Sequence, residues 1–377
     1  LLVELLVKLM DEGAEYVQLG QNDGSDRCHC PECNAFGGVP AEDWGEKLWI
    51  FHRRIAERVY KLRPTKTVLI INYGQTARPP KTFRDFPPNV AIECAVSCNS
   101  VAHEVWKGYT VPKGFVYYTY HWGNYEQPGY TVQSCVPQLA REARKYVKNG
   151  VRMLYRCGYG EKPGTEGPEY YVFNKILQDP SLDEDALFEE YVTACYGPAA
   201  DEMRKFHQLL EKRILPYSKT REGFSKPGDL YPTVSSTPGG AREVLTMIYP
   251  PEVLQELDGH LRKAEDLPDL PWKVTMRLKE VRLEFDYTLK LMKPLHLYQA
   301  YRMEPLPQLR EALADALVDR NRFLDVLYAG ERPITLWQGL KLFYWDKREM
   351  VQENGRLRAR IVEPLALDPE KVRKGEL

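Results

Sequence analysis

The feature that most restricts the fold is a regular alternation of short apolar strands and amphipathic helices over about the first 180 residues. Five runs rich in β-branched and aromatic residues occupy residues 15–20, 67–71, 90–96, 115–120 and 151–155. Each run is almost continuously apolar, which is typical of parallel strands covered on both faces. Helical periodicity lies between them, at residues 44–60 and 139–147. The alternation predicts an α/β fold with parallel strands and right-handed crossovers.

The second half of the chain has a different pattern, because from Asp183 onward only helical periodicity is found. Asp183 suits the N-cap of a first helix, which Gly197-Pro198 would end. A second helix should end at Pro216, and a Gly/Pro/Ser-rich loop is expected over residues 217–250. We therefore expect a (β/α) barrel portion over residues 1–180, an all-α domain over residues 181–350 and a charged tail over residues 351–377.

Composition limits the classes of partner. The 377 residues carry 52 Lys and Arg against 53 Asp and Glu, a formal net charge of -1, whereas nucleic acid or an anionic membrane as main partner demands a basic excess. No uncharged apolar run approaches the roughly 20 residues that cross a bilayer. The 24 Tyr, 7 Trp and 12 Phe include rings that could stack on sugars, although large core side chains account for most of them.

Polar residues follow the first predicted strand, in the segment Asn22-Asp23-Gly24. In parallel α/β folds the carboxyl ends of the strands are where ligands bind. We expect Asp23 to act as a catalytic acid or base and Asn22 to hold an amide or hydroxyl group of a substrate. The alternative is that Asn22 and Asp23 only shape an Asx-turn.

Two further carboxylates are candidates for catalysis. Glu93 lies inside a strand between Ile92 and Cys94, where a carboxylate is costly unless it is paired or functional. It is either the second catalytic carboxylate or the partner of a Lys or Arg on a strand. Glu161 stands with Glu166 and Glu169 in a Gly/Pro-rich stretch after the last strand, and one of these acids could reach the site. The alternative for this stretch is a solvated acidic loop.

Aromatic side chains gather at the end of the fourth predicted strand. Alternation along a strand sends Tyr118 and Tyr120 to the same side, and His121 and Trp122 follow at once. Together with Tyr73, after the second strand, they could form the floor of a sugar subsite. The alternative is that these rings are core residues.

Three cysteines are closely spaced in Cys28-His29-Cys30-Pro31-Glu32-Cys33. The C-x-C-x2-C spacing could hold a structural zinc ion or form a local disulfide, although the segment lacks an obvious fourth ligand besides His29. Cys94 or Cys98 could approach it from a neighbouring strand end. The sequence contains no Gly-rich phosphate loop, no H-E-x-x-H and no G-x-S-x-G, and we expect no cofactor to be required for a reaction.

Two blocks of the sequence resemble a bacterial family of domains of unknown function that is allied to glycoside hydrolases and includes endo-β-N-acetylglucosaminidases. The first block is Asn22–Gly24 with Cys28–Cys33, and the second is Leu177–Asp183 with Tyr191 and Tyr196–Ala199. The similarity covers about residues 1–215. It implies a (β/α)8 barrel followed by helices, a carbohydrate substrate, and a secreted or periplasmic protein.

Because a complete barrel has eight strands and five are found, we expect the C-terminal part of a (β/α)8 (TIM) barrel, with roughly three βα units upstream of Leu1. We expect a glycoside hydrolase acting on glycans that contain amino sugars. Asp23 would be the general acid/base, and either Glu93 or the acetamido group of the substrate would complete the mechanism. The alternatives are a glycan-binding or catalytically inactive relative and a structural-metal protein. Nothing in the sequence indicates an oligomeric state.

Overall fold

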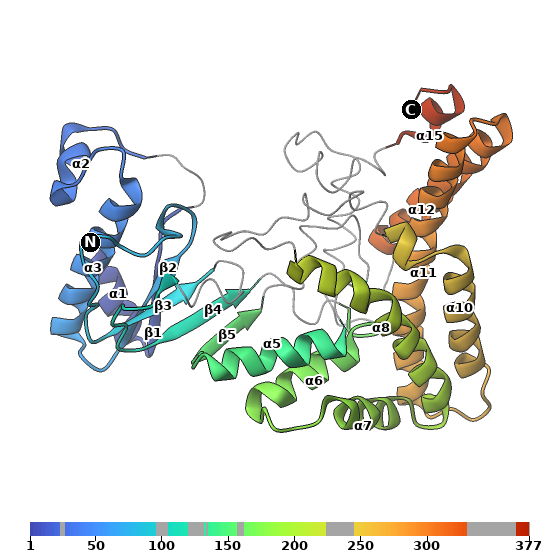
Figure 1. Cartoon of the computed structure of the whole chain (residues 1–377), viewed down its shortest axis with the longest axis horizontal. Helices are drawn as coiled ribbons and strands as arrows, with labels where there is room; N and C mark the ends of the chain where they lie inside the picture. The colour runs from blue at the N-terminus through green and yellow to red at the C-terminus, as the bar shows by residue number, and fades with distance from the viewer. Residues whose placement is uncertain are drawn as a thin grey trace. The chain divides into compact units, whose positions relative to one another are not determined.

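The computed structural model describes residues 1–22, 27–95, 105–119, 132, 135–156, 162–223, 245–329 and 367–376. These residues form two compact units (Figure 1). The first unit draws its described residues from 1–121 and 145–157 and contains the β-sheet. The second draws them from 122–144, 158–225 and 233–377 and is helical.

The sheet of the first unit contains five parallel strands in sequential order, β1-β2-β3-β4-β5. Their bounds are β1 (Tyr16–Leu19), β2 (Thr67–Asn72), β3 (Val90–Cys94), β4 (Phe115–Thr119) and β5 (Met153–Arg156). Every predicted strand is present, with ends within two residues of those expected. Parallel strands that follow one another around a sheet are the arrangement of a (β/α) barrel, so the predicted fold class, part of a TIM barrel followed by helices, is confirmed.

The register of the strands defines two faces. We call outer the face formed by Val17, Leu19, Val68, Ile70, Val90, Ile92, Cys94 and Tyr117, all of which are buried. The inner face carries Tyr16, Gln18, Leu69, Ile71, Glu93, Val116, Tyr118, Met153 and Tyr155, several of them exposed. Helices cover the outer face, as in a barrel, which leaves the inner face available for a site.

The helices of the first unit are α1 (Leu2–Asp11), the short α2 (Pro31–Ala35) and α3 (Trp44–Leu62), with 3-10 turns η1 (Phe36–Gly38) and η2 (Gly74–Thr76). Asn89, just before β3, donates from Nδ2 to the Ala56 carbonyl of α3 at 3.0 Å. The end of α5 (Val136–Lys148) places Tyr146 against Tyr117 of β4, with ring centroids 5.7 Å apart. An aromatic core joins Trp49 of α3 to Phe86 and Trp106, at centroid distances of 5.8 and 5.6 Å.

The second unit consists of α6 (Gly167–Gln178), α7 (Glu184–Tyr196), η3 (Gly197–Ala199), α8 (Ala200–Gly223), α10 (Pro251–Glu265), α11 (Trp272–Met303), α12 (Pro307–Ala329) and α15 (Pro369–Arg373) (Figure 1). Asp183 caps α7 as predicted, because its Oδ1 accepts from the Ala186 amide at 2.8 Å. The predicted end at Pro216 is wrong, since α8 continues through that proline to Gly223. A proline inside a helix removes one backbone hydrogen bond, and buried Leu210 and Ile214 on the preceding turns hold α8 in place.

Part of the segment expected to be a charged tail is packed. Residue Val372 of α15 is fully buried against Leu313, Ala314 and Leu317 of α12. Arg373 also pairs with Asp315 at 2.7 Å. Over the residues that the structure describes, no helix has the length and apolar character needed to cross a membrane.

Candidate functional site

Glu93 lies on the inner face of the sheet and is hydrogen-bonded across a strand. The Nε2 group of Gln18 on β1 donates to Glu93 Oε2 on β3, over the intervening β2. The register explains the contact, because Gln18 lies beside Leu69 and Glu93 beside Ile71, two residues further along the same face. Glu93 is 6% exposed, whereas Gln18 is exposed. A neutral side chain therefore orients a largely buried carboxylate.

The sequence left open that Glu93 forms an ion pair with a Lys or Arg on a strand. Within residues 1–22, 27–95, 105–119 and 135–156, Glu93 forms no such ion pair. The other carboxylate oxygen, Oε1, likewise has no hydrogen-bond partner in that part of the chain. With respect to the described residues, Oε1 of Glu93 is therefore available for a further interaction. Its neighbour Cys94 lies on the outer face, and burial raises the pKa of the Cys94 thiol far above its usual value. Cys94 is therefore a protonated core residue rather than a nucleophile.

Two tyrosine rings pack against each other, with their planes tilted, on the same face of the sheet as Glu93. Tyr118 of β4 is the register partner of Tyr155 of β5, and their ring centroids are 4.6 Å apart at an interplanar angle of 31°. Glu93 lies beside Val116, so Tyr118 is two residues, about 7 Å, nearer the carboxyl end of the sheet. Tyr118 is half-buried and Tyr155 is 53% exposed. The pair presents an aromatic surface between Glu93 and the carboxyl edge.

Several hydrogen bonds hold the turn after β2 and fix the backbone of Tyr73 at the end of that strand. Gln21 donates from Nε2 to Thr76 Oγ1 at 3.0 Å and to the Tyr73 carbonyl. Thr76 donates from its hydroxyl to the Ile71 carbonyl at 2.9 Å. Asn22 is exposed directly after Gln21, at the end of β1, and Tyr73 is half-buried. The two predicted binding residues Asn22 and Tyr73 therefore follow adjacent strands at the carboxyl edge.

Five of the predicted site residues lie outside the described residues: Asp23, Glu161, Tyr120, His121 and Trp122. Glu93 and Tyr118 lie on one face of the sheet, and the structure adds Gln18 and Tyr155, which the sequence analysis did not identify. Both missed residues carry a signal in the sequence. Gln18 interrupts an apolar strand, and Tyr155 ends one. Without the register, neither could be assigned to the face of Glu93.

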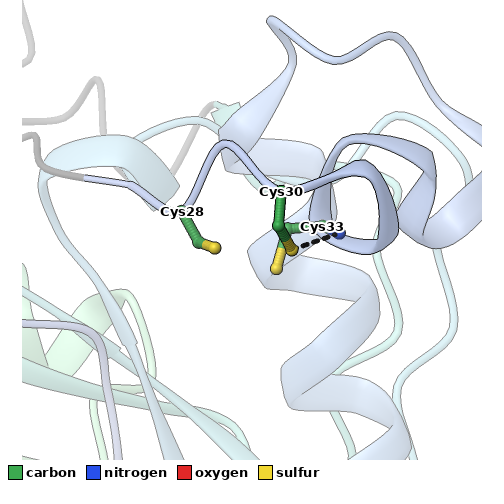
Figure 2. Close-up of side chains that lie close together, drawn as sticks. All are labelled: Cys28, Cys30 and Cys33. Carbon is green, nitrogen blue, oxygen red and sulfur yellow. Dashed lines mark hydrogen bonds between the residues drawn. The ribbon is translucent and has the colours of Figure 1, made fainter.

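Cys28, Cys30 and Cys33 are brought together, with all three sulfur atoms within 4.8 Å of one another (Figure 2). Cys30 is the N-cap of α2, and its sulfur accepts from the Cys33 amide at 3.4 Å. A hydrogen bond from the Cys30 backbone lowers the pKa of Cys28, while the hydrogen bond with the Cys30 side chain raises the pKa of Cys33 to about 11. The three cysteines are free, and Cys94 does not join their group. Cys98 lies outside the described residues.

In the second unit, Glu166 and Glu169 are buried, so the expectation of a solvated acidic loop is wrong for them. Glu166 pairs through Oε1 with Lys162 Nζ at 3.0 Å and accepts from the Tyr170 hydroxyl at 3.1 Å. Glu169 stands in the first turn of α6, and its Oε2 has no hydrogen-bond partner over the described ranges. Burial, followed by the nearby charge of Glu166, raises the pKa of Glu169 well above its usual value.

A third buried acid, Glu284 of α11, anchors the same segment. It accepts from the Gly164 amide at 3.0 Å, from the Thr165 amide at 2.7 Å and from the Thr165 hydroxyl at 2.5 Å. Burial outweighs these hydrogen bonds and raises the pKa of Glu284 to about 8. A Cβ atom at position 164 would lie 2.8 Å from the Val281 amide nitrogen, so only glycine allows this approach. This arrangement holds the segment before α6 to α11, which is a structural role.

The chain was compared with curated proteins and with models of protein families. No curated protein matches the chain. The family model described as "Domain of unknown function (DUF4838)" matches residues 2–208, which include the whole of the sheet and α6 and α7. Since the match covers more than half of the 377 residues, the chain belongs to this family of domains of unknown function.

Proposed function

We propose that this chain is a glycoside hydrolase that acts on glycans containing amino sugars. One observation supports the proposal above the others. The buried carboxylate of Glu93, oriented by Gln18, shares the inner face of a parallel sheet with the packed rings of Tyr118 and Tyr155. Ligands of barrel proteins bind at the carboxyl edge of the strands, toward which these tyrosines lie. The substrate class rests on the resemblance to endo-β-N-acetylglucosaminidases, and by the same resemblance we propose a secreted or periplasmic location.

The proposed reaction needs a pair of acidic groups. Asp23, which follows β1 in the sequence, donates a proton to the glycosidic oxygen as the bond to the anomeric carbon breaks. As that bond breaks, Glu93 acts through Oε1 in one of two ways. It either attacks the anomeric carbon, forming a glycosyl ester that water then hydrolyses while Asp23 takes a proton from that water, or it takes a proton from a water that attacks the anomeric carbon directly. In the alternative route, the acetamido oxygen of the substrate, oriented by Glu93, attacks the anomeric carbon, and water then opens the cyclic intermediate while Asp23 takes a proton from that water. In each route water is added across the glycosidic bond, and the reaction needs no cofactor.

The tyrosines supply binding energy and orientation. The face of a sugar ring carries C–H groups that pack on an aromatic ring, and the phenol hydroxyl offers a hydrogen bond at its edge. Tyr155 is exposed enough to receive such a ring, and Tyr118 supports it from β4. We propose that Tyr73 and Asn22, which follow β2 and β1 in the chain, contact a neighbouring part of the glycan.

The test compares three forms of the full chain: wild type, Glu93→Gln and Glu15→Gln. Glu15 precedes β1 at the opposite edge of the sheet, where it is exposed and pairs with Lys66, so the control removes a carboxylate without touching the inner face. Turnover is measured on an aryl N-acetyl-β-glucosaminide and on an N-glycan oligosaccharide. We expect Glu93→Gln to lower kcat by about 100-fold or more and Glu15→Gln to leave it unchanged. Asp23→Asn should have the same effect as Glu93→Gln.

Equal turnover by Glu93→Gln and wild type would remove Glu93 from the mechanism. Saturable binding of the oligosaccharide with no turnover by the wild type would instead favour the glycan-binding alternative. The circular dichroism melting temperature of each variant checks that a loss of turnover does not come from unfolding.

A further inference from the structure

We propose that Cys28, Cys30 and Cys33 bind one zinc ion as thiolates. The three sulfurs lie within 4.8 Å of one another (Figure 2). Sulfur atoms held about 2.3 Å from a tetrahedral zinc ion lie about 3.8 Å apart, so small side-chain rotations bring the cluster to the required spacing. This site goes beyond the proposed hydrolase activity and does not depend on it.

The local backbone supports the cluster. Cys30 is in an extended conformation before α2, and Pro31 starts that helix, which places Cys33 about one turn after Cys30. The Cys33 amide donates to Cys30 Sγ at 3.4 Å. Amide hydrogen bonds to a sulfur stabilise its thiolate form and fix its direction, as the outer contacts of metal sites do.

A buried lysine holds the chain immediately after the cysteines. Lys47 of α3 is 2% exposed, and its Nζ donates to the carbonyls of Asn34 at 2.7 Å, Phe36 at 2.9 Å and Val39 at 3.1 Å. These three bonds attach the turn that contains α2 and η1 to α3. The cysteine segment is therefore built on a rigid helix, which is the support that a metal site requires.

The cysteines of this cluster are more exposed to solvent than the core cysteines of the chain. Cys94 and Cys135 are buried and pack as small apolar residues. Cys28 is exposed, and Cys30 and Cys33 are half-buried, so packing does not explain why three thiols converge. A disulfide within the cluster would use two thiols and leave the third unpaired, whereas a zinc ion uses all three. Soft thiolate ligands select zinc over magnesium or calcium.

Among the described residues, the coordination that results has three protein ligands, and the fourth position is left for water or another ligand. His29 and Glu32 lie in the same segment, yet neither belongs to the group of converging ligand atoms. Three thiolates on a divalent ion carry one net negative charge, which an exposed position tolerates. The site is thus a three-cysteine zinc site at the surface of the first unit.

The test measures zinc binding to the reduced, chelator-treated full chain by native mass spectrometry and by competition with a chromophoric chelator. The variants are Cys28→Ser, which changes an exposed residue, and Cys30→Ser, which keeps a suitable N-cap for α2. Cys195→Ser is the matched control, because Cys195 is also half-buried and free but lies on α7. We expect one zinc ion per chain in the wild type and in Cys195→Ser. Zinc affinity should fall about 100-fold or more in Cys28→Ser and Cys30→Ser.

Cobalt substitution gives a second readout. Thiolate-to-cobalt charge-transfer absorption should appear in the wild type and weaken in Cys28→Ser. The proposal is wrong if the reduced wild type takes up no zinc, or if both cluster variants bind zinc as tightly as the wild type does. Recovery of a disulfide-bonded cluster that fails to bind zinc after reduction would also overturn it.

Discussion

The buried carboxyl group of Glu284 should make the free energy of unfolding depend on pH. Its pKa is about 8 in the folded chain, against an ordinary value of 4.5, because burial penalises the charged form. The folded state therefore binds a proton that the unfolded state releases between these two pH values. It follows that the contribution of Glu284 to stability is fully present below pH 4.5 and is lost as the pH rises to about 8.

The size of the effect follows from the same two values. Each pKa unit of difference corresponds to about 1.4 kcal/mol, so the free energy of unfolding should fall on the order of 5 kcal/mol across the whole window. Between about pH 5 and about pH 8 the loss should be on the order of 4 kcal/mol. Glu284→Gln removes the titration, so its free energy of unfolding should not contain this fall. The amide also leaves one of the Gly164 and Thr165 donors without an acceptor, which is a constant cost of about 1–3 kcal/mol at every pH.

The assay is urea unfolding followed by circular dichroism at several pH values between these limits. The readout is the difference in unfolding free energy between wild type and Glu284→Gln, because other titrating groups such as Glu169 are present in both forms and cancel. Glu304→Gln, an exposed position at the end of the same helix, is the control and should follow the wild type at every pH. If the difference stays constant within about 1 kcal/mol from acid to alkaline pH, Glu284 is ionised throughout and the reasoning from burial is refuted.

Two packing predictions concern glycine and leucine positions. Gly45→Ala would place a Cβ atom 2.3 Å from the Gln75 carbonyl oxygen, so we expect it to lower the free energy of unfolding by about 1–3 kcal/mol. Gly259→Ala is the control, because its Cβ atom in α10 would have no neighbour within 4 Å, and it should be neutral or slightly stabilising. Equal melting temperatures of the two variants would contradict this prediction. Leu317→Ala should lower the free energy of unfolding in urea by about 2–5 kcal/mol, because Leu317 is 1% exposed. Val326→Ala, at a position on the same helix that is 64% exposed, should lower it little. Similar losses in the two variants would show that α12 is not packed as described.

The sheet was predictable because of how parallel strands are buried. A strand covered on both faces needs apolar residues throughout, and residues 67–71 and 90–96 show such runs within a mostly polar chain. The face that a helix buries was harder to predict. Trp49 of α3 is 1% exposed, while Phe51 is 38% exposed although both are aromatic. Contacts with residues distant in the sequence determine which of the two rings is buried. Trp49 donates from Nε1 to the Arg78 carbonyl at 2.7 Å and packs on Phe86.

The buried acids were not predictable from local composition. Glu166 and Glu169 stand among glycines and prolines, which usually indicates a solvated loop. Their segment is buried because Glu284, which lies about 120 positions later in the chain, binds its backbone. A signal was present in the spacing of Lys162 and Glu166, four residues apart and opposite in charge, yet that spacing is also typical of exposed helices. The long-range contact with Glu284 is what distinguishes a buried segment from an exposed helix here.

The partner of Glu93 illustrates the same limit at the candidate site, and it also bears on the chemistry. A carboxylate inside a strand was recognisable from the sequence, but its partner depended on register, which places Gln18 two residues before Glu93 on the same face. A lysine at position 18 would have neutralised Glu93 and made it a structural ion pair. Glutamine orients the carboxyl group of Glu93 without forming an ion pair with it. Glycoside hydrolysis develops positive charge at the anomeric carbon, so a fixed carboxylate beside an aromatic surface is what the proposed reaction requires.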